Sequence, residues 1–216
     1  MLTFSLTYRG DMLLPQQRGI TEEKHKLRLE FHGQLMKMWK QSLVLKSINP
    51  EDLERVVENG KDGRRFDVTR NAEGKVKLYQ DTPLRGFMYQ RKLQGYRFVP
   101  LITETMEAHC HLAITFRRPM KPKSIIYAGG DLDGRLKTLF DALAMPPKSQ
   151  NLPDGQNGND ELCLCLLEDD ELITGFSVES KELLGNYPSG RYSELDIDVE
   201  IHGVTHMFGT RELWEG

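Results

Sequence analysis

Residues 129–143 read GGDLDGRLKTLFDAL, and this stretch predicts an amphipathic helix with charged side chains at its start. Its apolar residues recur at spacings of three and four, the period of a helix. The glycines before the helix let a ligand approach the backbone closely. Asp131 and Asp133 lie where the helix dipole favours negative charge. Lys137 follows Asp133 by one turn on the same helix face, where the two can also form an ordinary surface ion pair.

Alternating patterns on both sides of this helix predict β-strands. The clearest runs over residues 108–116, and others are predicted at residues 2–8, 172–178 and 192–201. Cys163 and Cys165 alternate with leucines, as expected of buried strand thiols. A helix from Thr21 has an apolar face formed by Leu27, Phe31, Leu35 and Met38.

The order of elements is β-α-(insert)-β-α-β-β, which predicts an α/β or α+β fold: a small mixed sheet packed with helices. We expect one domain over residues 1–216, with a basic, β-rich insertion at 47–105 and a flexible loop at 145–165. Within the insertion we expect a helix from Asn49 to Gly60, a hairpin around residues 71–74 and a strand over residues 96–102.

The composition indicates a folded protein, because 38% of the 216 residues are hydrophobic. No apolar run is long enough to cross a membrane, and no secretory signal is recognisable. Three cysteines without a CxxC pattern fit a reduced, cytoplasmic setting.

Charge is distributed unevenly along the chain, although the net charge is only −3. Residues 61–123 hold 14 Lys and Arg against 6 Asp and Glu, whereas residues 154–216 hold 3 against 15. These segments could form a basic surface that binds a polyanion and an acidic surface that binds a cation. The simpler interpretation is that both are ordinary charged surfaces in contact with solvent.

Aromatic and basic residues are interleaved within the insertion. Such a mixture can stack on bases and neutralise phosphates, but a small β layer with basic edges is the favoured interpretation. The residues concerned are Tyr79, Arg85, Phe87, Tyr89, Arg91, Lys92, Tyr96, Arg97 and Phe98.

A second acidic group, residues 168–171, follows an apolar strand. If the fold brings Asp131, Asp133 and Asp170 together, a cation is needed to hold them, and carboxylate oxygens suit Mg²⁺. Such a site can activate water against a phosphodiester, with Lys137 stabilising the developing charge.

His109 and His111 share the face of their strand opposite to its apolar side. A His-x-His pair on a strand can bind zinc, but no third or fourth ligand lies nearby in the sequence, so a solvent-facing pair is the favoured interpretation.

The motif over residues 131–143, followed by Asp169-Asp170 and an apolar strand, resembles the RusA-like family of Holliday junction endonucleases. The resemblance extends to an N-terminal strand, to the strand that ends in Arg117-Arg118, and to a turn before the last strand. It covers neither 47–105 nor 145–165, and Gly134 stands where the family motif has Asn.

This resemblance implies a Mg²⁺-dependent homodimer (Mn²⁺ as a substitute) of phage or prophage type. The dimer would cut four-way DNA junctions during recombination and repair. It makes Asp131, Asp133 and Asp170 metal ligands, with Asp169 as the alternative to Asp170, and Lys137 a catalytic lysine. Asp141 also matches the motif and is compatible with a structural role.

Two other functions stay open. One is a RusA-like module that binds DNA or protein without cleavage. The other is a phosphatase that uses Asp131, because haloacid-dehalogenase-like phosphatases carry an Asp-x-Asp-Gly-Thr motif. Here Arg135 replaces the Thr, and Gly129-Gly130 separates the motif from the preceding strand.

Overall fold

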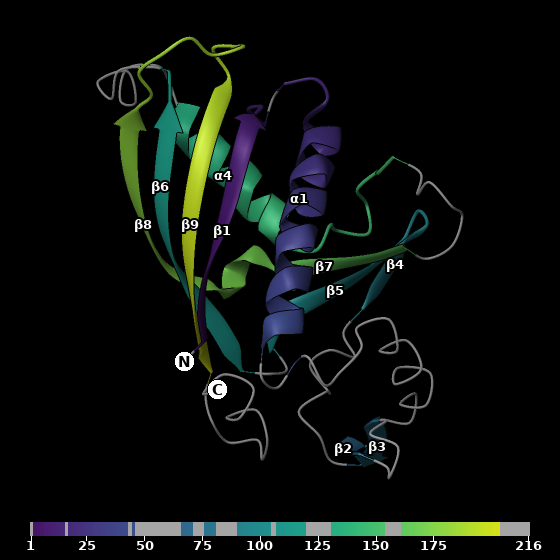
Figure 1. Ribbon diagram of the computed structural model, residues 1–216. Coiled ribbons are helices and arrows are strands. Elements are labelled where there is room, and N and C mark those ends of the chain that lie inside the picture. The colour runs from purple at the N-terminus through teal and green to yellow at the C-terminus, as the bar shows by residue number, and fades with distance from the viewer. Residues whose placement is uncertain are drawn as a thin grey trace.

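The computed structural model describes residues 2–15, 17–42, 45, 66–70, 76–80, 90–104, 107–119, 131–153 and 161–203. Within these ranges the chain forms two α-helices and two mixed sheets of four and three strands, with no closed barrel, together with a two-stranded hairpin. The predicted α+β class is therefore confirmed, and Figure 1 shows the arrangement.

The four-stranded sheet has the order β1-β9-β6-β8. Strand β9 is antiparallel to both of its neighbours, and β6 is parallel to β8. Its N-terminal and C-terminal strands are therefore adjacent, which ties the two ends of the described chain together. The bounds are Leu2–Asp11 for β1, Tyr192–Gly203 for β9, Ala108–Arg118 for β6 and Ile173–Glu182 for β8.

The three-stranded sheet has the order β4-β5-β7, in which β5 is antiparallel to β4 and parallel to β7. Strand β5 falls within the range expected for the insertion, yet Val99 and Ile102 belong to the main core. This end of the expected insertion is thus built into the domain. The bounds are Arg91–Leu93, Tyr96–Ile102 and Glu161–Leu167.

The predicted hairpin is confirmed in β2 (Phe66–Arg70) and β3 (Val76–Gln80), which pair antiparallel. The helix expected between Asn49 and Gly60 lies outside the described residues, as do residues 154–160 of the loop expected at 145–165. The loop prediction is wrong for residues 161–165, because they belong to strand β7.

Helix α1 (Ile20–Gln41) lies between the two sheets, and α4 (Asp131–Leu143) crosses one face of the four-stranded sheet (Figure 1). Gly19 precedes α1 with φ of 85°, a conformation that glycine adopts without strain. The predicted apolar face of α1 is confirmed, because Leu27, Phe31 and Leu35 are buried. Neither helix combines the length with the hydrophobicity that crossing a bilayer requires.

The free edge of β1 is occupied by a side chain of α1. Gln34 accepts a hydrogen bond from the Thr7 N–H at 2.8 Å and donates one to the Thr7 carbonyl at 2.7 Å. The amide thus takes the place of one residue of a neighbouring strand, which limits the pairing of this edge with another chain.

Strict alternation gives the four-stranded sheet an apolar inner face towards the helices and a polar outer face. On β9, Leu195, Ile197, Val199 and Ile201 are buried, and the residues between them point outward. The outward set on β9 is acidic, and it consists of Glu194, Asp196, Asp198 and Glu200. These four carboxylates form one stripe along the outer face of β9, which we call the acidic stripe.

Two residues of the interleaved aromatic and basic set are core residues rather than a stacking surface. Tyr96 and Phe98 are buried against His25, with ring centroids 4.6 Å and 6.4 Å from the imidazole. Arg97 is also buried. The base-stacking interpretation is therefore wrong for these residues.

The two faces of β9 should respond differently to truncation. Ile197→Ala is expected to lower the free energy of unfolding by about 2–5 kcal/mol, because it leaves a cavity in the core. Asp198→Ala, on the next residue, removes an exposed hydrogen bond from the Ser5 hydroxyl and should cost under about 1 kcal/mol. Urea unfolding of both variants measures the difference, and equal losses would contradict the assignment of the two faces.

Candidate functional site

A cavity of about 590 Å³ lies where the C-terminal end of α4 meets α1 and the segment after β7. Acidic and basic side chains share its wall, so we call it the mixed-charge cavity. Among the described residues its charged members are Lys24, Arg28, Arg91, Asp141, Lys148, Asp169 and Asp170. The cavity therefore offers carboxylates that can bind a metal cation and basic side chains that can bind an anion.

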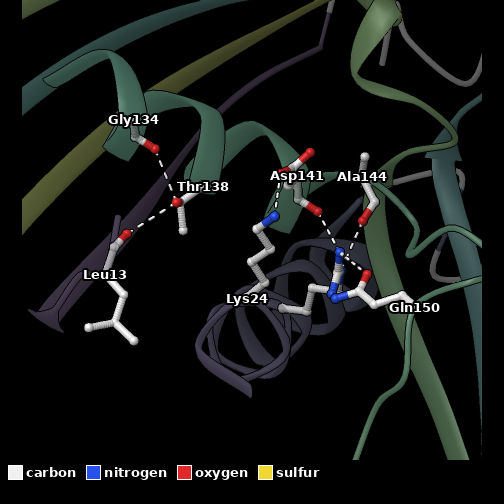
Figure 2. A network of polar contacts seen from close by, with 8 residues as sticks. Leu13, Lys24, Gly134, Thr138, Asp141, Ala144 and Gln150 are labelled. Carbon is white, nitrogen blue, oxygen red and sulfur yellow. Dashed lines mark hydrogen bonds and ion pairs between the residues drawn. The ribbon is translucent and has the colours of Figure 1, made fainter. Parts of the chain in front are cut away.

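Arg28 of α1 is buried and forms one wall of this cavity. Its guanidinium donates hydrogen bonds to the carbonyls of Asp141 at 2.6 Å and Ala144 at 3.0 Å, and to the Gln150 side chain at 3.4 Å (Figure 2). Carbonyls at a helix C-terminus lack partners within the helix, so the arginine caps α4. The remaining nitrogen, Nη1, is buried without a hydrogen-bond partner in the described part of the chain.

Lys24 lies one turn before Arg28 and faces the same end of α4. Its ammonium group is 2.5 Å from a carboxylate oxygen of Asp141, and both side chains are largely shielded from solvent (Figure 2). Asp141 therefore has a structural partner, as the motif comparison allowed. This ion pair keeps the Asp141 charge at the edge of the mixed-charge cavity.

Asp169 and Asp170 follow β7 at the start of the short 3₁₀ helix η5 (Asp170–Leu172). The Asp169 carboxylate accepts a hydrogen bond from the Glu171 N–H at 3.2 Å. Partial desolvation, a hydrogen bond with Asp169 and the negative charges of Asp169 and Asp141 together raise the pKa of Asp170. The two carboxyl groups are thus close enough to repel each other, a situation that a bound cation relieves.

The start of α4 is held by two buried polar side chains. Thr138 Oγ1 lies 3.1 Å from the carbonyls of both Leu13 and Gly134, which share its single hydroxyl proton (Figure 2). Arg135 donates to the Met12 carbonyl at 2.8 Å and to the Arg191 carbonyl at 3.2 Å. These bonds fix the motif helix to the end of β1 and the turn before β9.

The predicted ligands are divided between the two ends of α4. Asp131 is its first residue, and the description does not extend to its side chain. Asp133 and Lys137 are exposed and are not among the described residues that line the mixed-charge cavity. Asp141 lies eight residues after Asp133, or about 12 Å along the axis at 1.5 Å per residue. The structure thus brings Asp141, rather than Asp133, beside Asp169 and Asp170.

Two cavity residues were missed by sequence reasoning, although a signal for them existed. Lys24 and Arg28 are spaced by four, so they share one face of α1. Arg28 also sits between Leu27 and Phe31 on the apolar side of that helix. A basic residue in an apolar stripe indicates a buried charge with a specific partner.

Comparisons with protein-family models, with curated proteins and with solved structures found no match to this chain. The RusA-like resemblance therefore stays a prediction.

Replacing Gly134 with the Asn of the family motif should destabilise the protein. A Cβ at this position would lie 3.0 Å from Pro15 Cδ and 3.1 Å from Leu14 Cδ2, so the loop over α4 would have to move. We expect Gly134→Asn to cost about 1–3 kcal/mol, as other overpacked sites do. Gly33→Asn is the matched control, because a Cβ on Gly33 meets nothing within 4 Å. Thermal unfolding of the two variants measures the difference in stability between them. Equal melting temperatures would refute the close packing at Gly134.

Neutralising Asp169 should lower the pKa of Asp170. Asn at position 169 retains an acceptor for the Glu171 N–H but removes the neighbouring negative charge. Because the Asp170 pKa is raised by folding, its contribution to stability is present at low pH and is lost as pH rises through that pKa. Because Asp169→Asn makes the Asp170 pKa less raised, the variant should lose less stability than the wild type as pH rises. Carboxyl-carbon NMR titration of Asp170 measures the shift, and an unchanged pKa would show that the two groups do not interact.

Proposed function

We propose that this chain is a RusA-like, metal-dependent endonuclease that cleaves branched DNA, with the four-way junction as its substrate. The observation that best supports this proposal is the mixed-charge cavity, where Asp169 and Asp170 lie among cationic side chains. A phosphodiesterase needs both elements, because it holds a polyanion while a cation acts on one of its phosphates.

The donor set of the cavity suits Mg²⁺, because Asp169 and Asp170 offer only carboxylate oxygens at exposed positions that leave room for water. Partial desolvation and the neighbouring Asp169 raise the pKa of Asp170, and a divalent ion would stabilise the two ionised carboxylates. In this proposal Asp169 and Asp170 hold Mg²⁺, or Mn²⁺ in its place, and the resemblance adds Asp131 and Asp133. When bound, the ion would lower the pKa of an attacking water and polarise the phosphate.

The basic side chains of the cavity would position the DNA backbone. Arg91 and Lys148 lie on the wall beside Gln150, and of the two Lys148 is exposed to solvent. Donors of this kind neutralise phosphate oxygens and fix the register of the nucleic acid without reading its sequence. Lys137, on the exposed face of α4, is assigned the stabilisation of charge in the transition state.

The acidic stripe of β9 indicates which side of the molecule the DNA would occupy. Four carboxylates along the outer sheet face repel a phosphate backbone, and of these Asp196 forms an ion pair with Arg117. The mixed-charge cavity lies on the other side, among the helices. We therefore propose that the junction approaches the helical side. Action as a homodimer, with one site for each of two cuts, and in the cytoplasm are parts of the same proposal.

A second candidate is a module of the same fold that binds branched DNA without cutting it. The observation in its favour is the division of the predicted ligands, since Asp133 lies about 12 Å along α4 from Asp141 and the cavity. A site that lacked Asp131 and Asp133 would retain the basic contacts but hold a metal through fewer carboxylates.

Asp170→Asn is expected to reduce Mg²⁺-dependent nicking of a labelled four-way junction by at least about 100-fold, because even residues that only support a metal ligand change activity 10- to 100-fold. The matched control is Glu171→Gln, which removes the next carboxylate along the chain and should leave nicking unchanged. Circular dichroism establishes that both variants are folded.

The same assay with Asp133→Asn separates the two candidate sites. Loss in both Asp170→Asn and Asp133→Asn supports a site that spans both ends of α4, whereas loss in Asp170→Asn alone limits the site to the cavity. Full activity in Asp170→Asn would refute the proposed site. Salt-sensitive binding of the junction with no cutting in Mg²⁺ or Mn²⁺ would favour the binding module.

A further inference from the structure

Three histidines and a glutamate gather on the outer face of the four-stranded sheet, where the acidic stripe of β9 ends at Glu200. The antiparallel register sets His109 opposite His202 and His111 opposite Glu200. The stacked rings of His109 and His202 have centroids 5.4 Å apart, and those of His111 and His202 are 4.5 Å apart. His109 and His111 on β6 thus face Glu200 and His202 on β9, and the four side chains form the corners of one cross-strand square. The two pairs are about 90 residues apart in the chain.

The missing ligands for the His109-x-His111 pair therefore come from β9. The sequence contains Glu200-Ile201-His202 in its last strand, and only the pairing of β6 with β9 brings the two pairs together. The expectation of a solvent-facing histidine pair without further ligands is thus incomplete.

Three of these side chains are placed to share one ion. The ligand atoms of His111, Glu200 and His202 all lie within 4.8 Å of one another. His202 Nε2 lies 3.6 Å from a Glu200 carboxylate oxygen, and this nitrogen is buried with no hydrogen bond in the described chain. In a tetrahedral zinc site with bonds of about 2.0–2.1 Å, the ligand atoms lie about 3.3 Å apart. Side-chain rotations that move these three ligand atoms by about 1 Å would therefore bring them to zinc-binding distances.

A glycine on the neighbouring strand makes room for one of the ligands. Gly175 of β8 is paired with His111, and a Cβ on Gly175 would lie 2.9 Å from His111 Cδ2 and 3.1 Å from its Nε2. The imidazole can therefore lie over β8 only because this position has no side chain.

The cluster also borders an open space. A hollow of about 690 Å³ on the same sheet face has His111 and Glu200 in its wall, and its other outward-facing lining residues are small or polar. Three protein ligands beside such a space match the arrangement of open zinc sites, in which the fourth position takes water or a ligand. These other residues are Thr3, Ser5, Ala113, Gly175, Ser177 and Asp198.

We propose that His111, Glu200 and His202 form a binding site for a transition-metal ion of the Zn²⁺ type, with one coordination position open towards the hollow. Two imidazoles and one carboxylate favour Zn²⁺, Co²⁺ or Ni²⁺ over Mg²⁺, which prefers oxygen ligands. The site is separate from the mixed-charge cavity, since the two share no lining residue within the described chain.

Titration of the untagged full chain with Zn²⁺ tests this inference, with isothermal calorimetry as the readout. We expect one Zn²⁺ per chain at this site. His111→Ala removes the most exposed ligand and should raise the Kd for Zn²⁺ by more than about 100-fold. This is more than the roughly 10- to 100-fold loss typical of residues that only support a metal ligand. Glu194→Gln is the matched control, because it removes a carboxylate from the same sheet face, outside both the cluster and the hollow, and should leave the Kd unchanged.

Two further variants make the test independent of one substitution. Gly175→Ala should weaken Zn²⁺ binding by displacing His111, and Asp170→Asn should not affect it. In the Co²⁺-loaded protein, added thiocyanate should alter the visible spectrum if a position is open. No Zn²⁺ binding by the wild type, or equal binding by wild type and folded His111→Ala, would overturn the site; an unchanged Co²⁺ spectrum would overturn its open position.

Discussion

The buried guanidinium of Arg28 links the two helices and thereby shapes the mixed-charge cavity. Burial lowers the pKa of Arg28, so its charge is retained at a cost that must be offset by good partners. The carbonyls of Asp141 and Ala144 provide them, at the helix end where the dipole favours a cation. Ala144 then pairs with Leu167 at the end of β7, and the chain continues from there into Asp169 and Asp170. The position of the acidic pair therefore depends on how Arg28 holds α4.

The division of the sheet into two faces separates the two candidate sites. The inner face is apolar and packs on the helices, so the polar groups near it concentrate at the helix ends, where backbone carbonyls and N–H groups need partners. The outer face carries the acidic stripe and the His111, Glu200 and His202 cluster. The proposed ligands in the cavity are carboxylate oxygens alone, whereas the cluster on the sheet combines one carboxylate with two imidazole nitrogens. Each set suits a different kind of metal ion.

Sequence periodicity predicted most of the described fold. The predicted strand over residues 108–116, the predicted helix over 131–144 and the predicted last strand were confirmed, because each has one buried face and hence a regular apolar pattern. The place of β5 was not predictable in this way. Its seven residues are buried throughout, so they show no alternation, and the parallel pairing with β7 joins segments about 65 residues apart.

The candidate sites were less predictable, because they depend on contacts between distant segments. The spacing of Asp133, Lys137 and Asp141 places them on one helix face, but which of them meets Asp170 depends on how α4 lies against η5. Similarly, His109 and His111 were recognised as a pair, whereas Glu200 and His202 become their neighbours only through the register of β6 and β9.

The most direct test of the proposed function is the incubation of purified wild-type protein with a labelled synthetic four-way junction and a matched linear duplex, with and without Mg²⁺. The account predicts paired cuts on opposing strands of the junction alone, abolished by EDTA. Absence of cutting in Mg²⁺ and Mn²⁺, or equal cutting of the linear duplex, would contradict it.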